Sequence, residues 1–160
     1  MIAELKKDGS VELQIKRKLP FPRELVFEAW LSKDHLLRWM GPTEDIKPGF
    51  IEVDPQKEGK YRFGFDEKGS PDERHYVHGE YLTIEHPEKL VFTWIWEPPL
   101  PEAGVVSIVT VEFFEIESGT EMILTHQKFM DEKSCEKHRA GWIGTLDKME
   151  NHLKNVGKYK

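Results

Sequence analysis

The sequence has little of what would place the protein outside the cytoplasm. It contains one cysteine, Cys135, which excludes an internal disulfide and suits a reducing compartment. Its mean hydropathy is −0.59 and it has no long apolar run, which argues against a membrane span. The residues after Met1 include the charges of Glu4 and Lys6, so no signal peptide is expected. We therefore predict a cytoplasmic protein with no membrane partner.

Basic charge is also scarce. Lysine and arginine together number 23 against 29 aspartate and glutamate residues, which gives a net charge of −6 and a pI near 5.7. A domain that binds nucleic acid needs a basic face to meet the phosphates. We therefore predict no nucleic-acid partner.

The motifs of several common enzyme classes are missing. The chain has no Gly-Xaa-Ser-Xaa-Gly turn, no glycine-rich phosphate loop and no His-Glu-Xaa-Xaa-His zinc helix. Cys135 precedes His138 by one helical turn, so a thiolate–imidazole contact is one interpretation, and an inert buried cysteine is the other. We predict no catalytic residue, no metal site and no cofactor.

What the chain does contain is enough material for one domain. Its length is 160 residues, and 9 Phe, 5 Trp and 4 Tyr supply the large side chains that disordered chains lack. No repeat, low-complexity tract or long linker interrupts it. We predict a single domain over residues 1–160 with its core in about residues 11–155.

The hydrophobic period changes along the chain. Apolar residues alternate over 11–16, which predicts a strand, and two short helices follow, the second capped by Ser32. From Asp131 the period is helical and predicts a helix from Glu132 to Asn155, closed by Gly157. Further strands are predicted within residues 50–53, 61–65, 76–84, 90–96, 105–116 and 121–128.

Consecutive strands joined by short turns favour antiparallel pairing. A single long helix at the C-terminus is the natural cover for the apolar face of such a sheet. The predicted fold is therefore α+β, with a curved antiparallel sheet of about six to seven strands wrapped around the C-terminal helix, and two short helices after the first strand.

Several motifs, in this order, resemble one family: His35–Pro42, Gly59–Phe63, His86–Trp94, Leu124–His126 and Gly141–Trp142. The chain resembles START/Bet v-like helix-grip proteins (the SRPBCC superfamily). Within them it is similar to the AHSA-like branch, the activators of the ninety-kilodalton heat-shock protein (Hsp90) ATPase. The resemblance covers about residues 11–155 and implies the helix-grip fold. The family pattern has an arginine where Gln56 stands and a Gly-Gly pair at Glu58-Gly59.

Strand parity and helix spacing select the candidate site. Alternate side chains of a strand share one face, so several aromatic residues would meet a stripe of the last helix inside the sheet. The predicted ligand-binding residues are Trp39, Phe63, Tyr81, Phe92, Trp94, His126, Trp142, Leu146 and Met149. If they enclose a cavity, a volume of about 300–1,000 Å³ is expected. The alternative is that they fill a solid core.

Three functions fit these observations. The first is non-catalytic binding of a small hydrophobic or aromatic molecule in that cavity. The second, implied by the resemblance, is a cyclase/aromatase-type or hydrolase-type enzyme that uses the same cavity with His126, Tyr81 and His138. The third is a chaperone-activator-like interaction module, which predicts an exposed apolar patch and a chaperone partner. A monomer and a homodimer are both compatible with the sequence.

Overall fold

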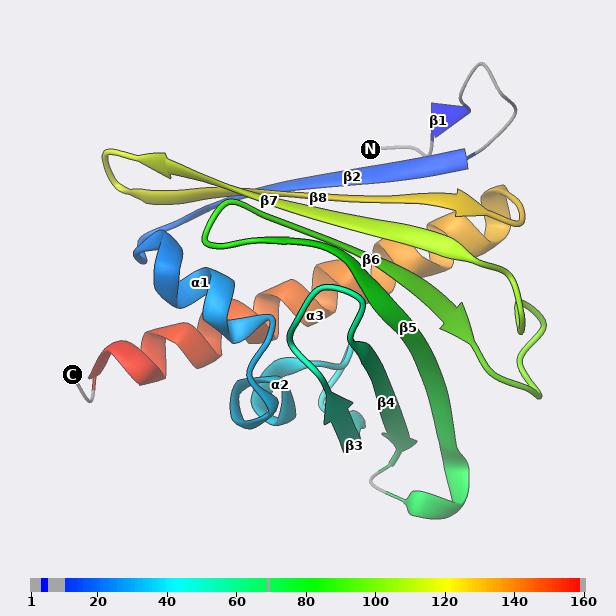
Figure 1. The fold of residues 1–160 in the computed structure, drawn as a ribbon. Coiled ribbons are helices and arrows are strands. Elements are labelled where there is room, and N and C mark those ends of the chain that lie inside the picture. The colour runs from blue at the N-terminus through cyan, green and yellow to red at the C-terminus, as the bar shows by residue number, and fades with distance from the viewer. Residues whose placement is uncertain (1–3, 6–10, 69, 159–160) are drawn as a thin grey trace.

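The computed structural model describes residues 4–5, 11–68 and 70–158. Strands and helices follow one another in the order of the sequence prediction (Figure 1). Their bounds are β1 Glu4–Leu5, β2 Val11–Leu19, α1 Arg23–Ala29, α2 Lys33–Trp39, β3 Ile46–Val53, β4 Lys60–Glu67, the 3₁₀ turn η1 Pro71–Glu73, β5 Arg74–Glu85, β6 Lys89–Trp96, β7 Ser107–Ile116, β8 Gly119–Phe129 and α3 Glu132–Lys158.

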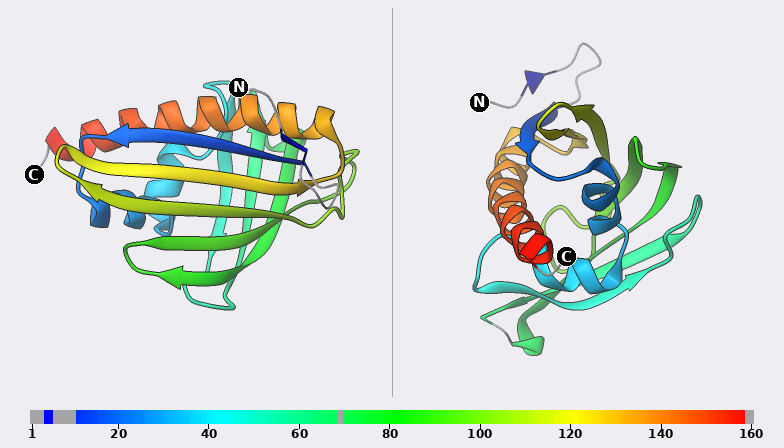
Figure 2. Two further views of the ribbon diagram at one scale, coloured as in Figure 1. Left: turned by 90° about the horizontal axis from the view of Figure 1, so that it is seen from above. Right: turned by 90° about the vertical axis from the view of Figure 1, so that its left-hand side faces the viewer.

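All strands belong to one antiparallel sheet with the order β1-β2-β8-β7-β6-β5-β4-β3. Figure 2 shows the sheet curving around one side of α3, with α1 and α2 near the C-terminal end of that helix. The predicted α+β fold is confirmed. Strands β2 to β8 are the predicted sheet, and the two-residue β1 adds one strand at its edge.

Helix α3 begins where the hydrophobic period changes. The Asp131 carboxylate accepts a hydrogen bond from the backbone N–H of Ser134, so Asp131 caps the first turn. The face turned to the sheet is buried and carries Trp142, Leu146, Met149 and Leu153 at helical spacing. The predicted end is wrong, because the helix continues through Gly157 to Lys158. Among the residues that the structure describes, no helix is long and apolar enough to cross a membrane.

Strand β3 begins earlier than its predicted start at residue 50. Pro48 and Gly49, which precede the predicted strand, lie inside β3. β3 is the last strand of the sheet, so the missing N–H of Pro48 costs no ladder bond on its open side. The pairing with β4 shifts register between Pro48 and Phe50, and this irregularity accommodates the two residues.

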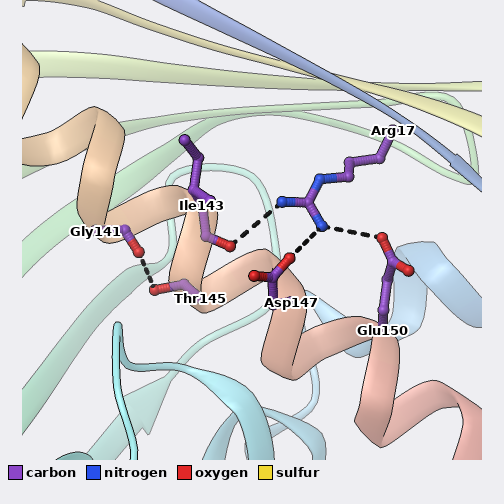
Figure 3. Close-up of polar contacts among 6 residues, drawn as sticks. All are labelled: Arg17, Gly141, Ile143, Thr145, Asp147 and Glu150. Carbon is purple, nitrogen blue, oxygen red and sulfur yellow. Dashed lines mark hydrogen bonds and ion pairs between the residues drawn. The ribbon is translucent and has the colours of Figure 1, made fainter.

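A cluster of ion pairs attaches α3 to β2. The Arg17 guanidinium donates to the Asp147 and Glu150 carboxylates at 2.7 and 3.0 Å, and to the backbone carbonyl of Ile143 at 3.3 Å (Figure 3). The Arg17 side chain is 19% exposed. One planar donor group therefore spans two turns of the helix from a single strand position.

We expect Arg17→Ala to lower the free energy of unfolding by about 1 kcal/mol, because Asp147 is solvated and screening weakens its share. Lys16→Ala on the same strand is the matched control, since Lys16 is exposed. Urea denaturation of both variants measures the difference. Equal stabilities for the two variants would show that the cluster does not hold α3 to the sheet.

Candidate functional site

A cavity of about 510 Å³ lies between the sheet and the first half of α3. Strands β4, β5 and β6 supply one wall, α3 supplies the opposite wall, and the segment between α2 and β3 contributes Met40 and Pro42. Leu100 and Glu102 reach it from the loop between β6 and β7. The volume falls within the range usual for small-molecule sites, about 300–1,000 Å³.

Four aromatic rings form a continuous wall of this cavity. The ring centroids of Phe65 and Trp96 are 5.7 Å apart, those of Trp96 and Trp94 are also 5.7 Å apart, and those of Trp94 and Trp142 are 5.1 Å apart. The indoles of Trp94 and Trp96 are nearly perpendicular, at 88°. All four side chains line the cavity. The wall is therefore apolar and built from flat surfaces at steep angles to one another.

His126 is fully buried next to this wall, and both of its ring nitrogens belong to a chain of hydrogen bonds. The indole N–H of Trp142 donates to its Nδ1 at 3.0 Å, and Ser107 Oγ lies 2.8 Å from its Nε2. The Ser107 hydroxyl donates its proton to the backbone carbonyl of Trp94, so its oxygen accepts from Nε2–H. Burial lowers the pKa of His126 well below its usual value, with the nearby His138 adding to the effect. The imidazole is neutral and both of its nitrogens are engaged.

His138 repeats this arrangement at the edge of the cavity, which it lines. The indole N–H of Trp96 donates to its Nε2 at 2.8 Å, and its Nδ1–H donates to the backbone carbonyl of Ser134 at 2.8 Å. Burial is the main cause that lowers the pKa of His138. This imidazole is therefore also neutral, with the opposite tautomer to that of His126.

Two polar atoms near the cavity are left over. Trp94 Nε1 and His75 Nδ1 are buried and have no hydrogen-bond partner within the described part of the chain. Both residues line the cavity. Each of these nitrogen atoms has almost no accessible surface, so neither is open to a molecule in the cavity.

With this geometry in place, comparison with known proteins decides the family. The family model described as "Activator of Hsp90 ATPase homolog 1-like protein" matches residues 20–154, most of the chain. The chain belongs to this family. The predicted resemblance is thereby confirmed, and the helix-grip fold described above is that of an Hsp90-ATPase-activator-like domain.

Solved structures agree on the fold of this activator-like domain. The AHSA1 protein of Silicibacter pomeroyi is 25% identical, with a TM-score of 0.79 over 91% of this chain and 99% of that one. A protein of unknown function from Staphylococcus aureus is 27% identical, with a TM-score of 0.75 over 93% and 96%. The AHSA1-like protein of Aeromonas hydrophila is 21% identical, with a TM-score of 0.72 over 91% and 94%, and shows the fold alone. Among curated proteins, none matches this sequence.

The activator-like domain brings two of the nine predicted site residues to this cavity, Trp94 and Trp142. The other seven are buried in the surrounding core: Trp39, Phe63, Tyr81, Phe92, His126, Leu146 and Met149. The space expected between them is filled by ring contacts, such as that of Tyr61 with Phe63 at 4.6 Å and with Phe92 at 5.7 Å. The cavity is thus displaced from the centre of the predicted set toward the loop between β6 and β7.

Sequence reasoning missed the residues at the open side of the cavity. Phe65 and Trp96 share the inward parity of their strands, so alternation places them correctly, although they stand at the strand ends. His75 follows the same parity in β5 as the buried Val77. Glu102 comes from an irregular loop, and no periodic signal predicts its position.

The side chains considered for an enzymatic function are not arranged or ionised for catalysis. Cys135 is fully buried, and burial raises its thiol pKa to about 11, so it is not the thiolate that nucleophilic catalysis needs. Burial also raises the pKa of Tyr81. His126 and His138 are both engaged by neighbours. Over the residues described, no group of three or more metal-ligating side chains comes together.

The two departures from the family pattern lie in one exposed loop before β4. The side-chain amide of Gln56 donates to the Asp54 carboxylate at 3.0 Å. Gln56 therefore makes a local contact at the position where the family pattern has an arginine. Glu58 has a φ of 67°, the left-handed conformation that favours glycine. This backbone conformation explains why the family pattern has a glycine at this position. The present chain adopts it with an exposed glutamate.

Proposed function

We propose that this protein binds a small hydrophobic or aromatic molecule in the 510 Å³ cavity and does so without catalysis. The observation that carries the proposal is the continuous wall of Phe65, Trp96, Trp94 and Trp142, whose rings line one face of an otherwise filled core. A preformed cavity of this size with mostly apolar walls is the usual form of a small-molecule site. Flat apolar ligands suit walls made of rings.

The distribution of exposed apolar side chains supports this function over a chaperone-docking patch. Trp30, Trp39 and Trp94 are each at most 4% exposed, and Trp96 lines the cavity. Among the residues whose burial the structure describes, the exposed large hydrophobic side chains belong to five different segments of the chain: Leu37, Leu82, Val106, Phe114 and Met130. The concentrated aromatic surface of the molecule is therefore inside the cavity.

Replacing Gly141 by a residue with a larger side chain, which would fill part of the cavity, tests this proposal. Gly141 lies in α3 and lines the cavity, and a Cβ built there would meet only Pro42 Cβ at 3.9 Å. Gly141→Leu is expected to weaken binding of 2-naphthalenemethanol at least about ten-fold, because the added side chain occupies the site of the probe. The helix itself gains, since glycine costs about 1 kcal/mol relative to alanine in a helix interior.

Gly141→Ala is the matched control, because its methyl group leaves most of the volume free. Isothermal titration calorimetry, with tryptophan fluorescence as a second readout, measures both variants and the parent. Saturable binding to the parent and to Gly141→Ala, with loss in Gly141→Leu, is the expected pattern. Absence of saturable binding to the parent, or equal binding by Gly141→Leu, would reject the cavity as the site. Mass spectrometry of molecules that co-purify with the native protein identifies the natural ligand.

A further inference from the structure

The cavity offers few hydrogen-bond donors to a ligand. The indole N–H groups of Trp96 and Trp142 donate to His138 and His126. The Nδ1–H of His138 donates to a backbone carbonyl. The Thr145 hydroxyl donates to the backbone carbonyl of Gly141 at 2.8 Å, within its own helix (Figure 3). Four donors of the lining are thus already used inside the protein.

Acceptors with negative charge are available instead. Glu67 and Glu102 belong to the cavity lining, Glu67 exposed and Glu102 half-buried, and neither has an ion-pair partner among residues 11–68 and 70–158. Burial lowers the pKa of His138, and the charge of Glu102 opposes that change, so this carboxylate acts on the interior of the site. Lys137, exposed like Glu67, is the one lysine or arginine among the described residues of the lining, so the two carboxylates outnumber it.

We infer that the ligand has an aromatic or apolar body and carries a positively charged ammonium group. This inference rests on the proposed function, because it concerns the ligand of the same cavity. The charged group lies between the aromatic wall and the carboxylates of Glu67 and Glu102. The apolar body extends toward the apolar side chains of Met40 and Pro42.

The aromatic wall fits a cation for a second, independent reason. The face of an indole attracts a cation within about 6 Å by about 0.5–2 kcal/mol, and the attraction grows when the cation is desolvated. Trp94 and Trp96 are nearly perpendicular, at 88°, and both line the cavity, so two indoles of different orientation border it. The indole N–H groups of Trp96 and Trp142 donate to histidines. These hydrogen bonds use the edges of the two rings and not their faces.

A carboxylate ligand meets the opposite conditions. It would approach two carboxylates of like charge, with Lys137 as the one lysine or arginine in the described lining to offset them. The unpaired N–H of Trp94 has almost no accessible surface, so it adds no donor for an anion in the cavity.

Three probes of one shape separate these cases: 2-naphthylmethylammonium, 2-naphthalenemethanol and 2-naphthoate. We expect the cation to bind about five- to ten-fold more tightly than the neutral alcohol at low salt, and the anion more weakly than either. Raising the salt concentration should reduce the preference for the cation, because the rim carboxylates are partly solvated. Calorimetry with the native protein measures all three.

The double variant Glu67→Gln/Glu102→Gln tests the assignment of the charges. It should lower the affinity for the ammonium probe by about three- to ten-fold and leave the affinity for the alcohol within about two-fold. Glu117→Gln is the control for one unit of charge, since Glu117 lies at the exposed turn between β7 and β8, away from the cavity lining. Lys137→Gln should act in the opposite direction and tighten binding of the ammonium probe.

The outcomes distinguish the inference from the function on which it rests. Binding of the alcohol with no advantage for the ammonium probe, or with tighter binding of naphthoate, overturns the inference while the cavity remains a ligand site. An advantage that survives in the double variant overturns the role of Glu67 and Glu102. Binding of none of the three probes overturns both the inference and the proposed function.

Discussion

Replacing Trp142 by alanine is expected to lower the free energy of unfolding by about 3–5 kcal/mol. Trp142 is 4% exposed and stands on the buried face of α3. Its ring contacts Trp94 at 5.1 Å and Trp30 at 5.8 Å, so its removal leaves space on two sides. The loss also removes the donor to His126 Nδ1, a fully buried acceptor, and an unpaired buried acceptor adds its own cost.

Trp142→Phe separates these two contributions. Phenylalanine keeps an aromatic ring in the core but has no N–H, so we expect a loss of about 1–3 kcal/mol from the unpaired His126 and the smaller ring. Chemical denaturation of both variants, analysed with a common slope, gives the free energies. A loss below about 1 kcal/mol for Trp142→Ala would mean that this face of α3 does not hold the fold.

The order of the strands and helices was predictable because each element has a local cause. Alternation marks the strands, Ser32 caps α2 by accepting from the backbone N–H of His35, and Asp131 caps α3. The start of β3 was not predictable from local signals. Pro48 is tolerated there only because β3 is an edge strand, and edge position is a property of the whole sheet.

The candidate site was predictable only in part, for a similar reason. Parity places His126 inside, and it is inside, but parity does not show that Ser107 from the neighbouring strand occupies its second nitrogen. The position of the cavity depends on how rings such as Tyr61 and Phe63 tilt together, which periodicity does not encode. Glu102 reaches the cavity from an irregular loop. Alternation therefore selects the right faces, and packing decides where the space remains.

Lowering the pH from 7 to 5 is expected to reduce the free energy of unfolding. His126 and His138 have folded-state pKa values below the unfolded value of about 6.5, in both cases chiefly because of burial. Between the unfolded and folded pKa values the unfolded chain binds more protons, so each histidine costs about 1.4 kcal/mol of stability per unit of falling pH. Above about pH 7 both forms are neutral and this dependence vanishes.

The hydrogen bonds explain why the fold resists these protons. A proton on His126 Nδ1 would face the N–H of Trp142, and a proton on His138 Nε2 would face the N–H of Trp96. In each case two donors would replace a donor and an acceptor, in a site that also lacks water to solvate the charge. Protonation therefore requires these pairs to separate.

His138→Gln is the informative variant, because the glutamine side chain retains an acceptor for Trp96 but does not titrate. We expect it to remove the smaller part of the decrease that the two histidines produce between pH 6.5 and 5, because the pKa of His126 is lowered further than that of His138. The pH dependence of stability that remains in the variant includes a contribution from His152, because burial also lowers the pKa of that residue. Keeping the range above pH 5 avoids Glu97, whose pKa the Arg62 hydrogen bonds lower from its usual value. Denaturation midpoints that stay constant from pH 7 to 5, or an unchanged slope in the variant, would show that His138 accepts a proton as readily in the fold as in the unfolded chain.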